Sequence, residues 1–170
     1  TNWRTGKHEA IAADAVILAT GGAGRVYSNT DNPERVTGDG YSLAVQAGLQ
    51  LRDMEFVQFY PIGWAQRGFP MWMCDATLGD FVPITDANGQ EFIHAAYERW
   101  GIKNGVECNY VARDKLAILM AEKDKTGGAF AHIEEVPDRL WHDRVFLYAV
   151  SLPRSFFRDI KTPLRVAPIE

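Results

Sequence analysis

The sequence has few of the residues that build metal centres and disulfide frameworks. Its 170 residues include only two cysteines, Cys74 and Cys108, and four histidines. Two cysteines 34 positions apart cannot form a zinc site and the histidines lack metal-like spacing, so we expect no metal. No secretory signal is recognisable. We therefore interpret the cysteines as free thiols of a reducing compartment and expect a cytoplasmic protein.

Long apolar runs and an excess of positive charge are also missing. No stretch approaches the ~20 apolar residues of a membrane helix, so we expect no membrane segment. The formal net charge of −4 at pH 7 argues against a nucleic-acid partner. G-x-S-x-G, P-loop and EF-hand patterns do not occur. The 46% hydrophobic content is nevertheless typical of a globular protein with a real core.

Glycine-rich turns next to apolar runs are the most informative feature. The β-branched run 15–20 stops abruptly at Gly21–Gly22, as a buried strand does when its backbone must lie close to a ligand. The acidic turn Thr37–Gly40 follows, then a predicted helix at 41–47 and a predicted strand at 54–60. This order indicates a nucleotide-type ligand held by backbone groups.

The strings ATGG (19–22), TGDG (37–40) and DMEFVQF (53–59) resemble the succinate dehydrogenase/fumarate reductase flavoprotein family, which includes L-aspartate oxidase. The resemblance is dense over residues 15–63 and traceable to residue 125. It implies an FAD-dependent oxidoreductase that transfers a hydride between flavin and a small (di)carboxylate. It also implies a small-molecule substrate and an electron-transfer partner subunit.

The same resemblance assigns the glycine turns to the cofactor. It places Thr20, Gly21, Gly22, Asp39 and Gly40 at FAD, because glycine lets a backbone approach a ligand closely. The alternative is an ordinary strand-end turn followed by a helix that Asp39 caps.

A catalytic arginine is implied by the stretch 111–115. Its Ala-Arg-Asp resembles a family motif whose arginine moves a proton to or from the substrate carbon opposite the flavin, which predicts catalysis by Arg113. Because arginine is a very weak acid, Asp75 is expected to relay protons to it in a dry site. The alternative is a solvated Arg113 paired with a nearby acid.

Two stretches depart from the family pattern. Where the family has QFHPTG, this sequence has QFYPIG, so Tyr60 and Ile62 replace a histidine and a threonine that help to hold a substrate carboxylate. Cys74 and Asp75 fall on the family's Thr-Glu pair, and the following RGEGG string is largely lost. Tyr60 and Cys74 are thus the predicted substrate-binding residues. An amino acid or enone substrate, or a non-catalytic scaffold subunit, remains an alternative.

The expected fold class is α+β, the end of an α/β FAD-binding domain (1–62) followed by an incomplete capping domain (63–170). The family's G-x-G-x-x-G fingerprint is absent, so we interpret the chain as an internal part of a longer flavoprotein that alone neither holds FAD tightly nor turns over. The expected elements are strands at 9–13, 15–20, 54–60 and 129–136, a hairpin with arms 82–85 and 90–93, and helices at 41–47, 109–123 and 137–144.

Overall fold

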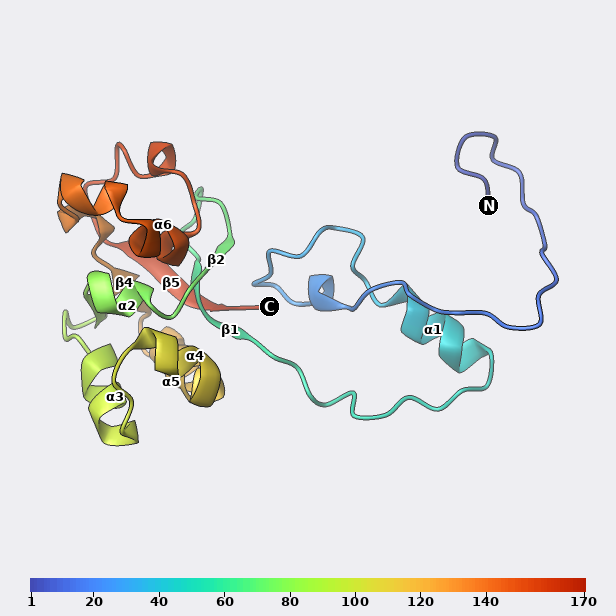
Figure 1. Cartoon of the computed structure of the whole chain (residues 1–170), viewed down its shortest axis with the longest axis horizontal. Helices are drawn as coiled ribbons and strands as arrows, with labels where there is room; N and C mark the ends of the chain where they lie inside the picture. The colour runs from blue at the N-terminus through green and yellow to red at the C-terminus, as the bar shows by residue number, and fades with distance from the viewer.

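A five-stranded sheet organises the computed structural model, which describes residues 1–170 (Figure 1). The strands lie in the order β2-β1-β5-β4-β3, and every neighbouring pair is antiparallel. The strands are β1 (Tyr60–Trp64), β2 (Trp72–Cys74), β3 (Ile84–Asp86), β4 (Ala129–Ala131) and β5 (Leu164–Ile169). The last strand of the chain therefore lies at the centre of the sheet.

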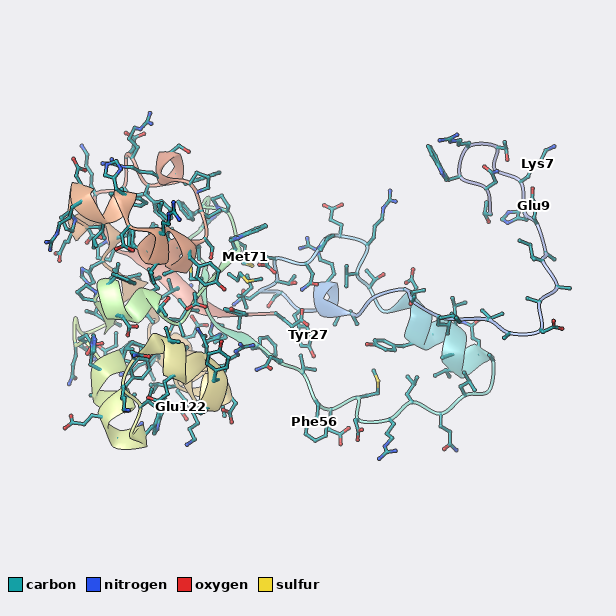
Figure 2. The ribbon with its side chains drawn as sticks, in the orientation of Figure 1. Lys7, Glu9, Tyr27, Phe56, Met71 and Glu122 are labelled. Carbon is teal, nitrogen blue, oxygen red and sulfur yellow. The ribbon has the colours of Figure 1, made fainter.

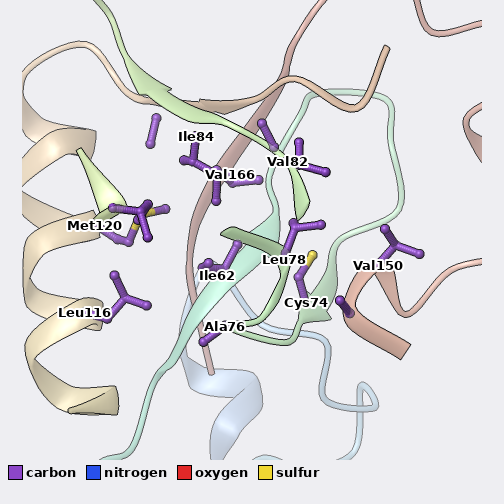
Figure 3. Packing of buried hydrophobic residues seen from close by; sticks show 14 of the residues in the cluster. Ile62, Cys74, Ala76, Leu78, Val82, Ile84, Leu116, Met120, Val150 and Val166 are labelled. Atoms are coloured by element: carbon purple, nitrogen blue, oxygen red, sulfur yellow. The ribbon is translucent and has the colours of Figure 1, made fainter. Parts of the chain in front are cut away.

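Helices cover this sheet and complete the core. They are α2 (Leu78–Phe81), α3 (Ile93–Trp100), α4 (Gly105–Val111), α5 (Arg113–Lys125) and α6 (Arg144–Val150). The first helix, α1 (Asp39–Gln46), lies apart from the sheet (Figure 1). Helix α5 packs against β1 and β5, whereas α6 packs against α2. Figure 3 shows Leu116 and Met120 of α5 on one side of Ile62 and Val166, with Val150 of α6 on the other. All five side chains are fully buried.

The first 59 residues form an arm that extends away from this body (Figures 1 and 2). Most of its apolar side chains are exposed, including Ile17 at 90% and Phe56 at 78%. It contacts the body through residues 29–32. There the Asn32 side chain donates to the Glu170 carboxylate (2.8 Å), and the Asp31 carboxylate accepts from the Met73 amide (3.1 Å).

Two expected strands are not formed, and a third is shifted along the chain. Residues 9–13 and 15–20 make no backbone hydrogen bonds, and residues 51–58 are exposed, so the strand expected at 54–60 instead runs from Tyr60 to Trp64. A strand is stable only when a neighbouring strand accepts and donates its hydrogen bonds. No strand of this chain pairs with residues 9–20 or 54–58 to do so.

The body follows the predictions more closely. Gly89 closes the predicted turn with its amide 2.9 Å from the Asp86 carbonyl, although the second hairpin arm shrinks to the single bridge between Thr85 and Glu91. The helix expected at 109–123 is split into α4 and α5, and the strand expected at 129–136 ends at Ala131. The predicted helix after Pro137 is a 3-10 helix over Asp138–His142.

Helices combined with an antiparallel sheet agree with the expected α+β class. None of the helices has the length and apolar character required to cross a lipid bilayer.

Candidate functional site

A cavity of about 230 Å³ opens between the start of β1, the turn after β2, and helices α4 and α6. Three residues predicted for the site, Tyr60, Asp75 and Arg113, meet in this cavity although they are distant in sequence. The complete lining comprises Tyr60, Asp75, Thr77, Val106, Asn109, Tyr110, Arg113, Val145 and Tyr148.

A β-bulge lies next to Tyr60, at the start of strand β1. Tyr60 pairs with Ile169 and Gly63 pairs with Ala167, so strand β1 has one more residue than β5 across this interval. Pro61 lies in the interval, and proline is tolerated within sheets mainly at bulges and edges because it has no N–H to donate. Such bulges redirect neighbouring side chains.

Arg113 begins helix α5 and stacks on Tyr60. Its guanidinium carbon lies 5.2 Å from the centre of the Tyr60 ring, a cation–π geometry. The half-buried Arg113 belongs to none of the ion pairs in the chain, and its Nε is buried without a hydrogen-bond partner. The structure therefore differs from the alternative of a solvated, acid-paired arginine.

Tyr60 lies in a mixed electrostatic environment. Burial raises the pKa of its phenol, Asp75 and Tyr148 add to that increase, and Arg113 acts in the opposite direction. The Asp75 charge and the Arg113 charge thus both reach the same phenol. The cavity contains a cation and an anion that do not pair with each other.

Asp75 is held by neutral donors. Its Oδ1 accepts hydrogen bonds from the Thr77 amide (2.9 Å) and the Thr77 hydroxyl (2.7 Å). The side-chain nitrogen of Asn109 donates to both Asp75 oxygens, at 2.8 and 2.9 Å. Asp75 is only 6% exposed. Because an ionised carboxylate can only accept hydrogen bonds, these contacts satisfy most of its hydrogen-bonding capacity.

Nothing in the sequence indicated that Asn109 belongs to the site. Asn109 and Arg113 are four residues apart, which would place them on one face of a continuous helix. The backbone leaves helical geometry at Ala112 (φ −149°, ψ 23°), where α4 ends and α5 begins. No glycine or proline marks this break in the sequence.

Cys74 and Ile62 lie in the hydrophobic core. Both side chains are fully buried (Figure 3) and neither lines the cavity. Burial raises the pKa of the Cys74 thiol well above its ordinary value. Because it does not line the cavity, Cys74 makes no contact with it. Ile62, which stands where the family pattern has threonine, is likewise no part of the cavity wall.

The predicted cofactor residues gather in the arm. The Gly38 amide donates to the Gly22 carbonyl at 3.2 Å, and a Cβ on Gly40 would lie 1.9 Å from the Thr20 hydroxyl oxygen. A Cβ at Gly21 or Gly22 would meet nothing within 4 Å, so this side of the turn is open to a ligand.

Helix α1 starts at this turn without a side-chain cap. Gly38, rather than Asp39, is the N-cap residue, and Asp39 instead accepts a hydrogen bond from the Thr37 hydroxyl at 3.0 Å. The free amides of an uncapped N-terminus attract anions such as phosphate. Open glycines beside an uncapped helix end fit a dinucleotide.

The two groups of predicted residues lie in separate parts of the structure. Thr20–Gly22 and Asp39–Gly40 are in the arm, whereas Tyr60, Asp75 and Arg113 are in the body (Figure 1). A larger hollow of about 560 Å³ between the arm and α5 contains none of these residues. We consider the smaller cavity the candidate site because the buried polar groups converge there.

A separate cluster joins His132, Glu134 and Glu135, although their sequence lacks a metal-ligand pattern. His132 Nδ1 lies 3.3 Å from a Glu134 oxygen and 3.9 Å from a Glu135 oxygen. These contacts are those of histidine–carboxylate pairs, and none of the three residues lines the cavity.

Comparisons with known proteins point to flavoproteins. Residues 1–157 match the FAD binding domain family. The chain is 41% identical over 100 residues to an L-aspartate oxidase of Streptomyces coelicolor, covering 55% of this chain and 17% of that protein.

Fumarate reductase flavoprotein subunits match as well. Identity is 59% over 59 residues with that of Mycobacterium tuberculosis (35% of this chain, 10% of that protein) and 41% over 122 residues with that of Escherichia coli (72% and 19%). The chain thus spans 10 to 19% of the length of these three relatives.

The match over 157 residues indicates FAD as the cofactor. The chain belongs to the FAD-binding flavoprotein family that includes the fumarate reductase flavoprotein subunits and L-aspartate oxidases.

Proposed function

We propose that the full-length protein transfers a hydride between FAD and a small carboxylate substrate, with Arg113 exchanging a proton with the substrate. The observation that carries this proposal is the unpaired Arg113 guanidinium, which stacks on Tyr60 in a cavity shared with Asp75. An arginine without an acid partner keeps its planar donors available to a carboxylate.

This proposal assigns separate residues to FAD and to the substrate. FAD, when bound, supplies the redox chemistry. Its contacts are assigned to Thr20–Gly22 and Asp39–Gly40, which combine open glycines with an uncapped helix end. The Arg113 Nη atoms hold the anionic group and exchange the proton, while Asp75 supplies protons to the cavity that it shares with Arg113 without pairing with it. The division of the chain at residues 62 and 63 is part of the same proposal.

Tyr60 affects which substrate the proposed site can bind. It offers a neutral hydroxyl where relatives of this pattern carry a histidine, so a carboxylate on this wall would meet a hydrogen-bond donor but no charge. A substrate other than a C4 dicarboxylate is therefore included in the test.

The test uses the full-length flavoprotein under anaerobic conditions. Flavin reduced with dithionite is challenged with fumarate or cyclohexenone, and oxidised flavin is challenged with L-aspartate. Turnover by wild type should fall by about 10²–10⁴-fold in Arg113→Ala, the usual contribution of a positioned acid or base. Lys115→Ala, which removes an exposed cation two residues away, is the control and should retain activity.

Unchanged turnover in Arg113→Ala would refute the arginine's role. A folded, full-length protein that binds no flavin would favour a non-catalytic subunit instead.

A further inference from the structure

Asn109 connects helix α4 to the charged centre of the cavity. Its side-chain nitrogen donates to both oxygens of Asp75, at 2.8 and 2.9 Å. The remaining donors to Asp75 come from Thr77. All donors to this carboxylate are thus neutral, and no ion pair of the chain includes it.

The chemistry of the contact determines the orientation of the amide. A carboxylate only accepts hydrogen bonds, so the NH₂ group of Asn109 must face Asp75 and its oxygen must point away. That oxygen is buried without a partner. Buried polar atoms are nearly always paired in proteins, so a residue chosen for stability alone would not leave this oxygen unsatisfied.

Opposite charges that share a partly buried cavity attract each other strongly. Asp75 and Arg113 both line the cavity and both influence Tyr60, yet they do not pair. Without the Asn109 amide, Thr77 would hold the carboxylate through Oδ1 alone, and Oδ2 would have no donor and would turn toward the guanidinium. The resulting pair would occupy the donors that an incoming anion needs.

We propose that Asn109 is a positioning residue: its amide holds the Asp75 carboxylate apart from Arg113 and so keeps the guanidinium free for the anionic group of the substrate. The inference rests on the proposed function, because that function gives Arg113 an anionic ligand. Residue types of similar shape would not serve at position 109, because leucine lacks the donors and aspartate would repel Asp75.

The local fold supports this role. The Gly105 amide, at the start of α4, donates to both oxygens of Asp80 at 2.9 Å and lies against the backbone of Ala76 and Thr77. Helix α4 is therefore docked on the turn that carries Asp75. The break at Ala112 then lets Arg113 take a direction of its own toward Tyr60.

The test is a double-mutant cycle in the FAD-loaded, full-length protein. Malonate, a small dicarboxylate probe, is titrated while the flavin absorbance is followed. Asn109→Leu should weaken malonate binding by about tenfold or more, because Arg113 paired with Asp75 would no longer donate to malonate, and a hydrogen bond between charged groups contributes about this much. In an Asp75→Asn background, which has no carboxylate to release, the same substitution should change the affinity less than about twofold.

Two results would overturn the inference: unchanged affinity in Asn109→Leu, or an equal loss in both backgrounds, which is the signature of a merely structural residue. If wild type binds no malonate, the proposed carboxylate function fails separately. A crystal structure of Asn109→Leu then decides the inference alone, because Asp75 paired with Arg113 supports it and an unmoved Asp75 contradicts it.

Discussion

Replacing Gly105 with alanine tests how helix α4 positions the candidate site. An added Cβ would lie 2.5 Å from the Ala76 carbonyl oxygen and from two backbone atoms of Thr77, whereas ordinary contacts begin at 3.4 Å. Backbone atoms cannot rotate out of the way as side-chain ends do. Helix α4 and the 75–77 turn must therefore separate by about 1 Å, a form of overpacking that typically costs about 1–3 kcal/mol of stability.

The same displacement reaches the cavity. A shift of about 1 Å would lengthen the hydrogen bonds between Asn109 and Asp75 to about 3.9 Å, beyond the range of a hydrogen bond. Gly105→Ala should therefore lower both the free energy of unfolding and the affinity for malonate. Urea unfolding and flavin-monitored titration of the full-length protein measure the two effects.

Gly89→Ala is the matched control, because Gly89 has φ +77° but nothing within 4 Å of the added Cβ. It should cost about 1–2 kcal/mol through left-handed backbone strain while leaving malonate affinity unchanged. If Gly105→Ala destabilises the protein by less than about 0.5 kcal/mol, within the usual range of neutral surface changes, the packing argument is wrong. Destabilisation without loss of affinity would show that α4 does not position the site.

Two further predictions concern titrating groups. The Lys123 ammonium donates to the Asp86 carboxylate at 2.8 Å and lowers the pKa of Asp86, with added contributions from the backbone amides of Gln90 and Asn88. The Lys123–Asp86 pair therefore stabilises the folded state above the unfolded pKa of Asp86, about 3.9. This stabilisation is lost as pH falls through the lower pKa of Asp86 in the folded state. Lys123→Met should therefore melt below wild type at pH 7, with a gap that narrows below about pH 4; a gap independent of pH would contradict the assignment. Burial raises the pKa of both cysteine thiols, so iodoacetamide at about pH 8 should modify them only upon unfolding, and mass spectrometry that detects either adduct on the folded protein would refute this.

Short-range signals in the sequence predicted local structure well. Asp86 and Asn88–Gly89 produced the expected turn because the Asp86 carboxylate accepts from the Asn88 amide and Gly89 adopts positive φ. The apolar spacing of Leu116 and Met120 correctly predicted a helix that buries them. These features depend on residues a few positions apart, whose chemistry a sequence displays directly.

Features that depend on distant partners could not be predicted in this way. The run 15–20 has the composition of a strand, but a strand also requires a neighbour to share its hydrogen bonds. The sequence likewise did not reveal that Ile62 and Cys74 point into the core, because the bulge at Pro61 and the pairing of β2 with β1 decide their direction. The environment of Arg113 follows from Tyr60 and Asp75, which only tertiary packing brings to it.

The central position of β5 has a consequence for synthesis of the protein. Without β5, strands β1 and β2 have no connection to β3 and β4, because β5 alone pairs with both halves of the sheet. Tyr60 must therefore wait for Ile169 to leave the ribosome before their pairing can form. During that interval the nascent chain exposes unpaired strand edges, which are prone to aggregation. Folding of this body is expected to be late, slow and dependent on chaperone protection, as is typical of sheets closed by distant contacts.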